Sequence, residues 1–162
     1  MNKILCAVAG AVAVLWAGVP GTVGASGVDA VFRCEVERFG GGKPVSEGGG
    51  GWLSPQTFFE FSDNWQKVQV IDTRVTTSRE GTVYAKVKQA RDGSFKFKWR
   101  VSRPTSLDIW TPVGYRAELD PQSKTGVLRA KVSLGYHSRI RGELTCEQIK
   151  RSDIPEPDQL QF

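Results

Sequence analysis

The sequence predicts an all-β fold, a single antiparallel eight-stranded barrel or sandwich, and three observations lead to it. After residue 25 the chain holds 13 Val and 9 Thr against 7 Leu and 5 Ala, a composition that favours strands. Apolar and polar residues alternate with a period of two, and no segment shows a helical period. Two cysteines lie near the two ends of this region. The length of 162 residues fits one domain.

Residues 1–25 have the pattern of a secretory signal peptide. Lys3 precedes an uncharged run over 4–15, residues 20–21 break the run as Pro-Gly, and small residues end it at 23–25. A membrane anchor is the alternative, but the run is shorter than the ~20 residues that span a bilayer. We therefore expect an exported protein, periplasmic or secreted, with no transmembrane segment in the mature chain.

Removal of the signal peptide also removes Cys6 and leaves Cys34 and Cys146. An even pair of cysteines in an exported chain predicts a disulfide. In a strand order that follows the sequence, this bond would join the first strand to the last.

The first three predicted strands differ in how clear their alternation is. In the first, the apolar residues Ala30, Phe32, Cys34 and Val36 alternate with Val31, Arg33, Glu35 and Glu37. Residues 57–61 contain three Phe, which blur the phase. Residues 67–75 change phase between Val70 and Ile71, which predicts a β-bulge there.

The next two strands, 83–88 and 95–101, form the clearest pair. The three-residue connection 91–93 is Arg-Asp-Gly, and its glycine suits the left-handed position of such a hairpin loop. This loop would place Lys88 directly opposite Lys96.

The last three predicted strands, 113–119, 128–134 and 140–146, repeat the same alternation. Because consecutive strands usually neighbour each other, we expect an eight-stranded meander. The β-domain would cover 26–149. Residues 150–162 contain two prolines and are expected to be an exposed C-terminal tail.

The chemistry of enzymes and metal sites has little support in the sequence. His137 is the single histidine, so a three-histidine metal site is excluded, and nothing indicates a catalytic triad or a Cys-His pair. Carboxylate pairs such as Glu60 with Asp63 exist, but their spacing does not single them out. We predict no enzyme activity, no cofactor and no metal.

Charge gives the more informative pattern. The full chain has a net charge of +5, and the polar faces of the two central strands are basic. This candidate anion patch consists of Lys86, Lys88, Lys96, Lys98 and Arg100. Arg129, Lys131, Arg139 and Arg141 repeat the outward placement. Solvated lysines on a sheet face are the simpler interpretation. The functional one is binding of an anionic glycan, a lipid or an acidic protein, with nucleic acid less expected for an exported chain.

A second candidate site is the rim of the barrel. In a meander the connections after strands one, three, five and seven share one end, including the glycine-rich segment 39–55. This candidate binding rim brings together Trp52, Arg103, Asp108, Trp110, Tyr136 and His137. Aromatic rings beside polar groups suit a small-ligand or glycan site. The alternative is that the tryptophans only plug the end of the barrel.

Short motifs give the chain a resemblance to known proteins. They are Phe32-Arg33-Cys34, Phe97-Lys98-Trp99-Arg100, Tyr115-Arg116-Ala117 and 141–146, Arg-Gly-Glu-Leu-Thr-Cys. The layout resembles small exported bacterial β-proteins of unknown function, which implies no activity. It is also similar to periplasmic lysozyme inhibitors, which are compact antiparallel barrels. The chain departs from them in lacking a clear counterpart of their Ser-Gly loop and in being basic.

The sequence therefore leaves three functions open. The first is an exported soluble binding domain, and the second is an inhibitor of an exported enzyme such as a lysozyme. The third is a small outer-membrane barrel, in which apolar faces would point at lipid and basic faces inward.

Overall fold

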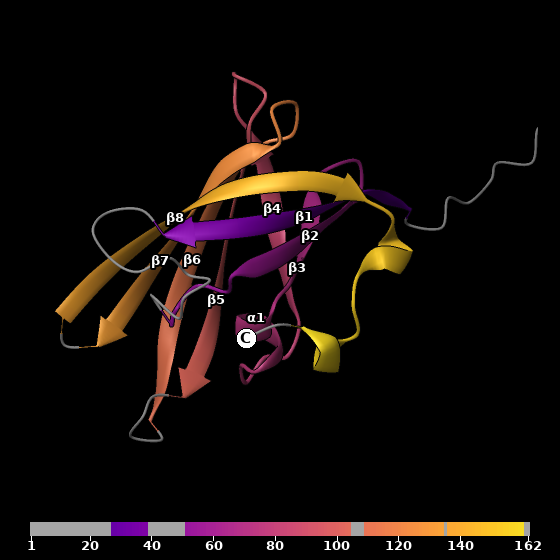
Figure 1. Cartoon of the computed structure of the whole chain (residues 1–162). Helices are drawn as coiled ribbons and strands as arrows, with labels where there is room; N and C mark the ends of the chain where they lie inside the picture. Colours follow the sequence, from indigo (N-terminus) through magenta and orange to yellow (C-terminus); the bar gives the residue numbers. More distant parts are fainter. Residues whose placement is uncertain (1–26, 39–50, 105–108, 135, 161–162) are drawn as a thin grey trace, which may run out of the picture.

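The computed structural model describes residues 27–38, 51–104, 109–134 and 136–160 (Figure 1). The signal peptide predicted over 1–25 lies outside the described residues. The strands are β1 (Val28–Arg38), β2 (Gln56–Ser62), β3 (Lys67–Ile71), β4 (Val83–Gln89), β5 (Phe95–Pro104), β6 (Trp110–Asp120), β7 (Thr125–Leu134) and β8 (Tyr136–Ile149). A short helix, α1 (Thr73–Thr76), follows β3.

The eight strands form one closed antiparallel barrel in the order of the sequence. The predicted meander is confirmed, and the barrel is the correct choice over the sandwich. Closure pairs β8 with β1, and Cys34 lies directly opposite Cys146 in that register. The predicted disulfide joins them, with their Cα atoms 4.0 Å apart. Below, the α1 end is the end of the barrel at α1 and residues 51–55, and the hairpin end is the opposite one.

The β4–β5 hairpin has the predicted register. Lys88 pairs with Lys96 and Val87 with Phe97. Gly93 has a φ of 84°, in the left-handed region that favours glycine. The Asp92 side chain accepts hydrogen bonds from the Ser94 backbone N–H and hydroxyl, which fixes the turn.

The third strand was predicted wrongly beyond Ile71. It ends there instead of bulging, and α1 begins after Asp72. The Asp72 carboxylate accepts a hydrogen bond from the Val75 backbone N–H at 2.8 Å and so caps the helix. The β-branched residues that follow Asp72 have strand propensity, and the local cap overrides it.

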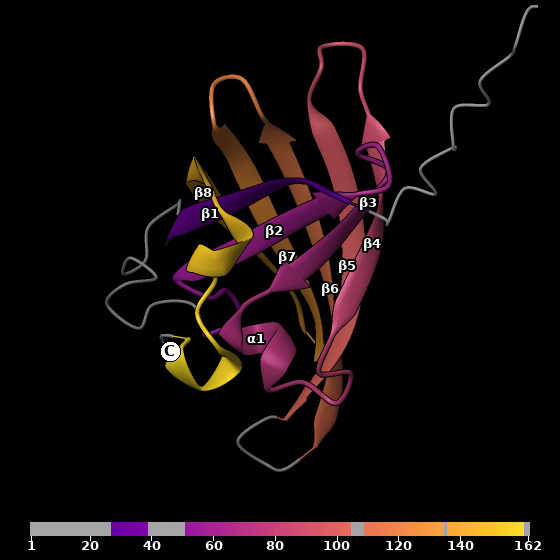
Figure 2. The ribbon, with the colours of Figure 1, turned by 90° about the vertical axis from the view of Figure 1, so that its right-hand side faces the viewer.

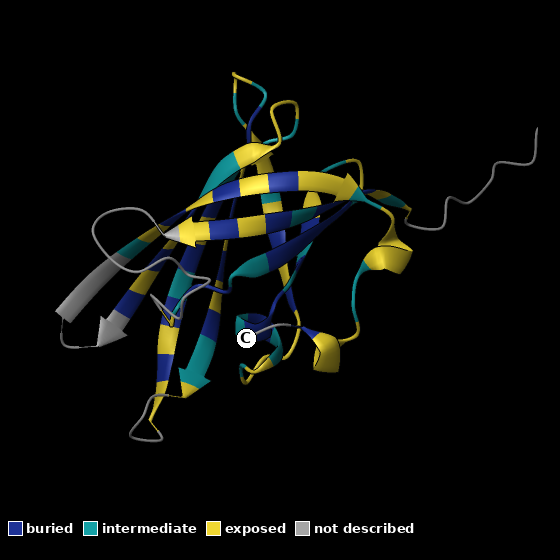
Figure 3. Ribbon diagram, in the orientation of Figure 1, coloured by how far each residue is buried: buried dark blue, intermediate teal, exposed yellow. Residues whose placement is uncertain are grey.

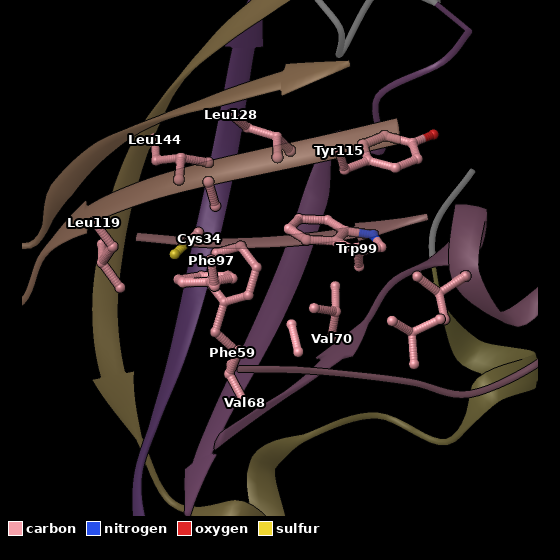
Figure 4. Packing of buried hydrophobic residues seen from close by; sticks show 14 of the residues in the cluster. Cys34, Phe59, Val68, Val70, Phe97, Trp99, Tyr115, Leu119, Leu128 and Leu144 are labelled. Carbon is pink, nitrogen blue, oxygen red and sulfur yellow. The ribbon is translucent and has the colours of Figure 1, made fainter. Parts of the chain in front are cut away.

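Buried and exposed residues alternate along the strands (Figure 3), and the buried apolar side chains form one core inside the barrel. Aromatic rings form a column along it. Trp99 stacks on Tyr115, with ring centroids 5.2 Å apart and planes 9° from parallel. Phe97 lies between Trp99 and Phe61, and Figure 4 shows its neighbours in the core. The described interior is thus a packed core.

The hairpin end of this column is closed by Trp65 in the β2–β3 connection. Its ring stacks on Phe95 at 5.1 Å. Asp63, Asn64 and Trp65 all have positive φ, between 54° and 63°. Asp and Asn tolerate this region, whereas a tryptophan there is strained. Packing against the core offsets the strain and seals the barrel.

Apolar residues point into the barrel, and the described basic side chains in the middle of β4–β8, such as Lys86, Lys98 and Arg129, are exposed on its outside. This is the reverse of the arrangement that the outer-membrane alternative requires. In the described part of the chain, no helix is long and apolar enough to cross a membrane.

The C-terminal segment departs from a free tail. Most of its residues are exposed as expected, but Leu160 is only 5% exposed. The Arg151 guanidinium lies 3.0 Å from the Glu60 carboxylate on β2. Figure 2 shows the segment passing over β1 and β2 toward α1. Val31 and Phe58, which lie on the outward phase of the same two strands, are buried as well.

Candidate functional site

Basic side chains occupy the outer surface of β5–β8. We call the following group the basic face: Lys98, Arg100, Arg116, Arg129, Lys131 and Arg141. All six residues are exposed. The strand registers place four of them in one row across the sheet, in the order Lys98, Arg116, Arg129 and Arg141. Strand alternation turns each of these side chains away from the core.

A hollow of about 890 Å³ lies on the basic face. Of its eleven described lining residues, six are basic and none is acidic. Gly114 sits within it, directly between Arg100 on β5 and Lys131 on β7. A Cβ at Gly114 would meet no atom within 4 Å. The missing side chain therefore leaves space between the flanking cations.

Like charges face each other directly along the row. Lys98 pairs with Arg116, Arg116 with Arg129, and Arg129 with Arg141. Opposed like charges on adjacent strands are unfavourable, by up to about 1 kcal/mol for a pair. The strand register alone does not require cations there. An anion bound over the row would reduce the repulsion between these cations, so the arrangement suits a surface that binds anions.

A carboxylate marks the edge of the basic face toward the hairpin end. Glu118 lies 2.9 Å from Lys96 Nζ and 3.8 Å from the Arg129 guanidinium. Its hydrogen bond raises the pKa of Lys96. Lys96 therefore has an acidic partner within the protein, so the candidate anion patch is not uniformly basic.

The candidate anion patch from the sequence is present but is part of a larger surface. Lys86, Lys88, Lys96, Lys98 and Arg100 are all exposed. A second hollow of about 550 Å³ lies over β4–β7 and shares Lys98, Arg116 and Arg129 with the first. Sequence reasoning missed Arg116, although the alternation in 113–119 turns it outward. The hollow at Gly114 depends on cross-strand neighbours and has no local signal.

The structure brings together part of the candidate binding rim. The Arg103 guanidinium lies 5.8 Å from the centre of the Trp52 ring and donates a hydrogen bond to the Gly51 carbonyl. Trp110 is 42% exposed, with the Arg79 guanidinium 4.9 Å from its ring centre. Asp108 lies outside the described residues, as do the side chains of Tyr136 and His137.

Trp52 has the contacts expected of a plug. Its side chain is half-buried against the core. Its carbonyl accepts a 2.6 Å hydrogen bond from the Tyr115 hydroxyl, which points to the α1 end. These contacts favour a structural role for Trp52 over a ligand contact.

A buried polar cluster at the α1 end was not foreseen. Asp72 accepts a hydrogen bond from the Thr57 hydroxyl, and burial raises the pKa of its carboxyl. The Arg74 guanidinium donates to the Leu53 carbonyl; burial first, and then the charge of Arg103, lower the pKa of Arg74. Burial also raises the pKa of the Tyr115 hydroxyl. The sequence has no local pattern that predicts this cluster, since its residues come from separate elements and meet only in the folded structure.

Comparisons with known proteins add no relative. No family model, curated protein or solved structure matches the chain. Among the described residues, no group of three or more His, Cys, Asp and Glu is placed to hold a metal ion.

Proposed function

We propose that this protein is an exported binding domain whose basic face holds a linear polyanion, with an acidic glycan as the best-fitting class. The observation that carries the proposal is the row of four cations across β5–β8, beside a hollow that six basic residues line. The disulfide is consistent with an oxidising compartment.

The geometry of the row favours a chain over a flat surface. Adjacent strands lie about 4.8 Å apart, so four cations extend over roughly 14 Å. The row crosses four of the eight strands of a closed barrel and must follow its curvature. A flexible polyanion follows a curved row, whereas a planar bilayer contacts only part of it. An acidic glycan therefore reaches more of these cations than a lipid surface does.

Binding assays with heparin and with phosphatidylglycerol vesicles test the proposal. The variant Lys98→Gln/Arg116→Gln/Arg129→Gln removes three charges from the basic face. Its matched control, Arg91→Gln/Lys124→Gln/Lys150→Gln, removes three exposed charges from outside both hollows. We expect the first variant to bind heparin about tenfold more weakly, because three exposed contacts of roughly 0.5 kcal/mol each sum to the ~1.4 kcal/mol that corresponds to a factor of ten.

The control and added salt give the contrary outcomes. The control variant should keep most of its heparin affinity, and the native protein should lose affinity as salt is added. Equal losses in both variants would mean that net charge alone drives binding. Stronger binding to the vesicles than to heparin would assign the face to a lipid surface instead. Relief of like-charge contacts should leave the basic-face variant at least as thermally stable as the native protein.

A further inference from the structure

Two buried N–H donors near the α1 end have no acceptor. Trp99 is only 7% exposed, and its indole Nε1 has no hydrogen-bond partner in the described part of the structure. The Nε atom of Arg103 is also buried and without a partner there. A buried donor left unsatisfied costs about 1–3 kcal/mol, so such groups are rare and need an explanation.

Tyr115 connects the two donors. Its ring stacks on Trp99, and the charge of the Arg103 guanidinium acts on its hydroxyl. The Tyr115 hydroxyl donates its own proton to the Trp52 carbonyl. Figure 4 shows the Trp99 nitrogen and the Tyr115 oxygen toward the same side of the core. The two side chains that carry the donors are therefore both neighbours of Tyr115.

The charges here are not balanced. Arg74 and Arg103 are close enough that the charge of Arg103 disfavours the charge on Arg74. Asp72 is the acidic group that interacts with Arg74, and its oxygens already accept from the Val75 N–H and the Thr57 hydroxyl. Burial favours its neutral form. Among the described residues, the two guanidiniums thus share at most one carboxylate, which leaves an excess of positive charge in this part of the structure.

The walls beside the donors are apolar. Val101 pairs with Val113 in the register next to the Trp99–Tyr115 pair. Both valines are fully buried. A bound group would meet N–H donors at one point and aliphatic or aromatic surface around it.

We propose that the α1 end of the barrel binds the oxyanion of a small, partly apolar acid. One of its oxygens accepts hydrogen bonds from Trp99 Nε1 and Arg103 Nε, and the charge of Arg74 stabilises the anion. The sheet separates this site from the basic face, because Trp99 and Tyr115 point into the barrel and the cations of the basic face point outward. A carboxylate and a phosphate share the required chemistry.

Nuclear magnetic resonance of the oxidised protein tests this site through the indole N–H of Trp99. The resonance is assigned by its loss in Trp99→Phe, which keeps an aromatic ring on Tyr115. Benzoate and inorganic phosphate are titrated separately at constant ionic strength. We expect a saturable shift of this resonance with at least one of the two. Benzoate alone would indicate a carboxylate with an apolar body, and phosphate alone a phosphorylated ligand.

Two variants separate this site from the basic face. Arg103→Gln should weaken the titration at least about tenfold, because a charge-assisted hydrogen bond is worth about 1.5–3 kcal/mol. Arg103→Lys keeps the charge but lacks the Nε donor, so it should also weaken binding of the probe. It serves as the test if Arg103→Gln does not fold. The basic-face variant Lys98→Gln/Arg116→Gln/Arg129→Gln should titrate like the native protein.

The proposal is overturned if neither probe moves the Trp99 resonance, which would leave a bound water as the acceptor. It is also overturned if the basic-face variant weakens the shift as much as Arg103→Gln does. Failure here would leave the heparin experiment unaffected, because the two assays use different residues.

Discussion

Asp72 ends one element, begins another and is buried between them. It follows β3, caps α1 through the Val75 N–H and accepts from Thr57. Burial is the largest influence on its carboxyl and raises the pKa above 3.8. The folded protein therefore binds this proton more tightly than the unfolded chain. Its contribution to stability is present in full below pH 3.8 and is lost as pH rises through the raised pKa.

Asp72→Asn should remove this pH dependence, because the amide does not titrate and still caps the helix. We expect the melting temperature of the variant, relative to that of the native protein, to increase as pH rises from about 3 to about 7. Thermal unfolding followed by circular dichroism over this range measures it.

Asp92→Asn serves as a control of opposite sign. Hydrogen bonds from Ser94 lower the pKa of Asp92, so its contribution is present above pH 3.8 and lost as pH falls through the lowered pKa. The relative melting temperature of this variant should decrease as pH rises. Parallel pH profiles for the two variants would contradict the assignment.

Single residues show which local features sequence reasoning can reach. The left-handed Gly93 was predictable because a three-residue hairpin loop needs that conformation. The helix cap at Asp72 was missed because the residues after it, Thr73 and Val75, are common in strands. The unpartnered donors of Trp99 and Arg103 have no signature in the sequence, since burial and partners are set by the whole fold.

At the scale of the strands, a period of two was enough to place most side chains. It turned Phe97 and Trp99 inward and Lys98 and Arg100 outward. The register could be derived only for the β4–β5 hairpin, whose loop is short. The row on the basic face depends on three further registers, β5–β6, β6–β7 and β7–β8. The connections between these strands do not determine the registers from the sequence.

Gly114→Val tests the hollow between those strands. A side chain at this position meets nothing within 4 Å, and a β-branched residue suits a strand better than glycine by about 1 kcal/mol. We expect the melting temperature to stay equal or increase while heparin affinity decreases, since the valine would occupy space between Arg100 and Lys131. Titration calorimetry and thermal unfolding measure the two effects.

Gly142→Ala is the matched control for this glycine. Its Cβ would lie 2.7 Å from Val36 Cγ1 and 2.9 Å from the Glu37 carbonyl oxygen. It should therefore lower the melting temperature and leave the heparin affinity of the folded protein unchanged. Unchanged heparin affinity in Gly114→Val would exclude the hollow from the binding surface.

At the scale of the molecule, the β1–β8 seam joins the two ends of the domain. The disulfide links residues 112 positions apart, so it restricts nearly the whole unfolded chain. The composition, the strand count and the cysteine pair were sufficient to predict the meander and this seam, and they left the choice between a barrel and a sandwich open. The position of the C-terminal segment over β2 was not predictable, because it depends on long-range contacts such as Arg151 with Glu60.

Cys34→Ser/Cys146→Ser should fold, because backbone hydrogen bonds still pair β1 with β8. We expect its free energy of unfolding in urea to be about 2–4 kcal/mol lower than that of the native protein, as for disulfides that close long loops. Reduction of the native protein should give the same loss. Equal stability of the oxidised and reduced forms would show that the seam does not need the bond.

The basic face is the proposed binding surface of this protein. Its most direct test is the change in backbone amide chemical shifts when a heparin-derived hexasaccharide is added to the ¹⁵N-labelled protein. We expect the largest changes at 98–100, 114–116 and 129–131, with small changes on β1–β3. Changes spread evenly over the barrel, or concentrated on β1–β3 and the C-terminal segment, would contradict the claim.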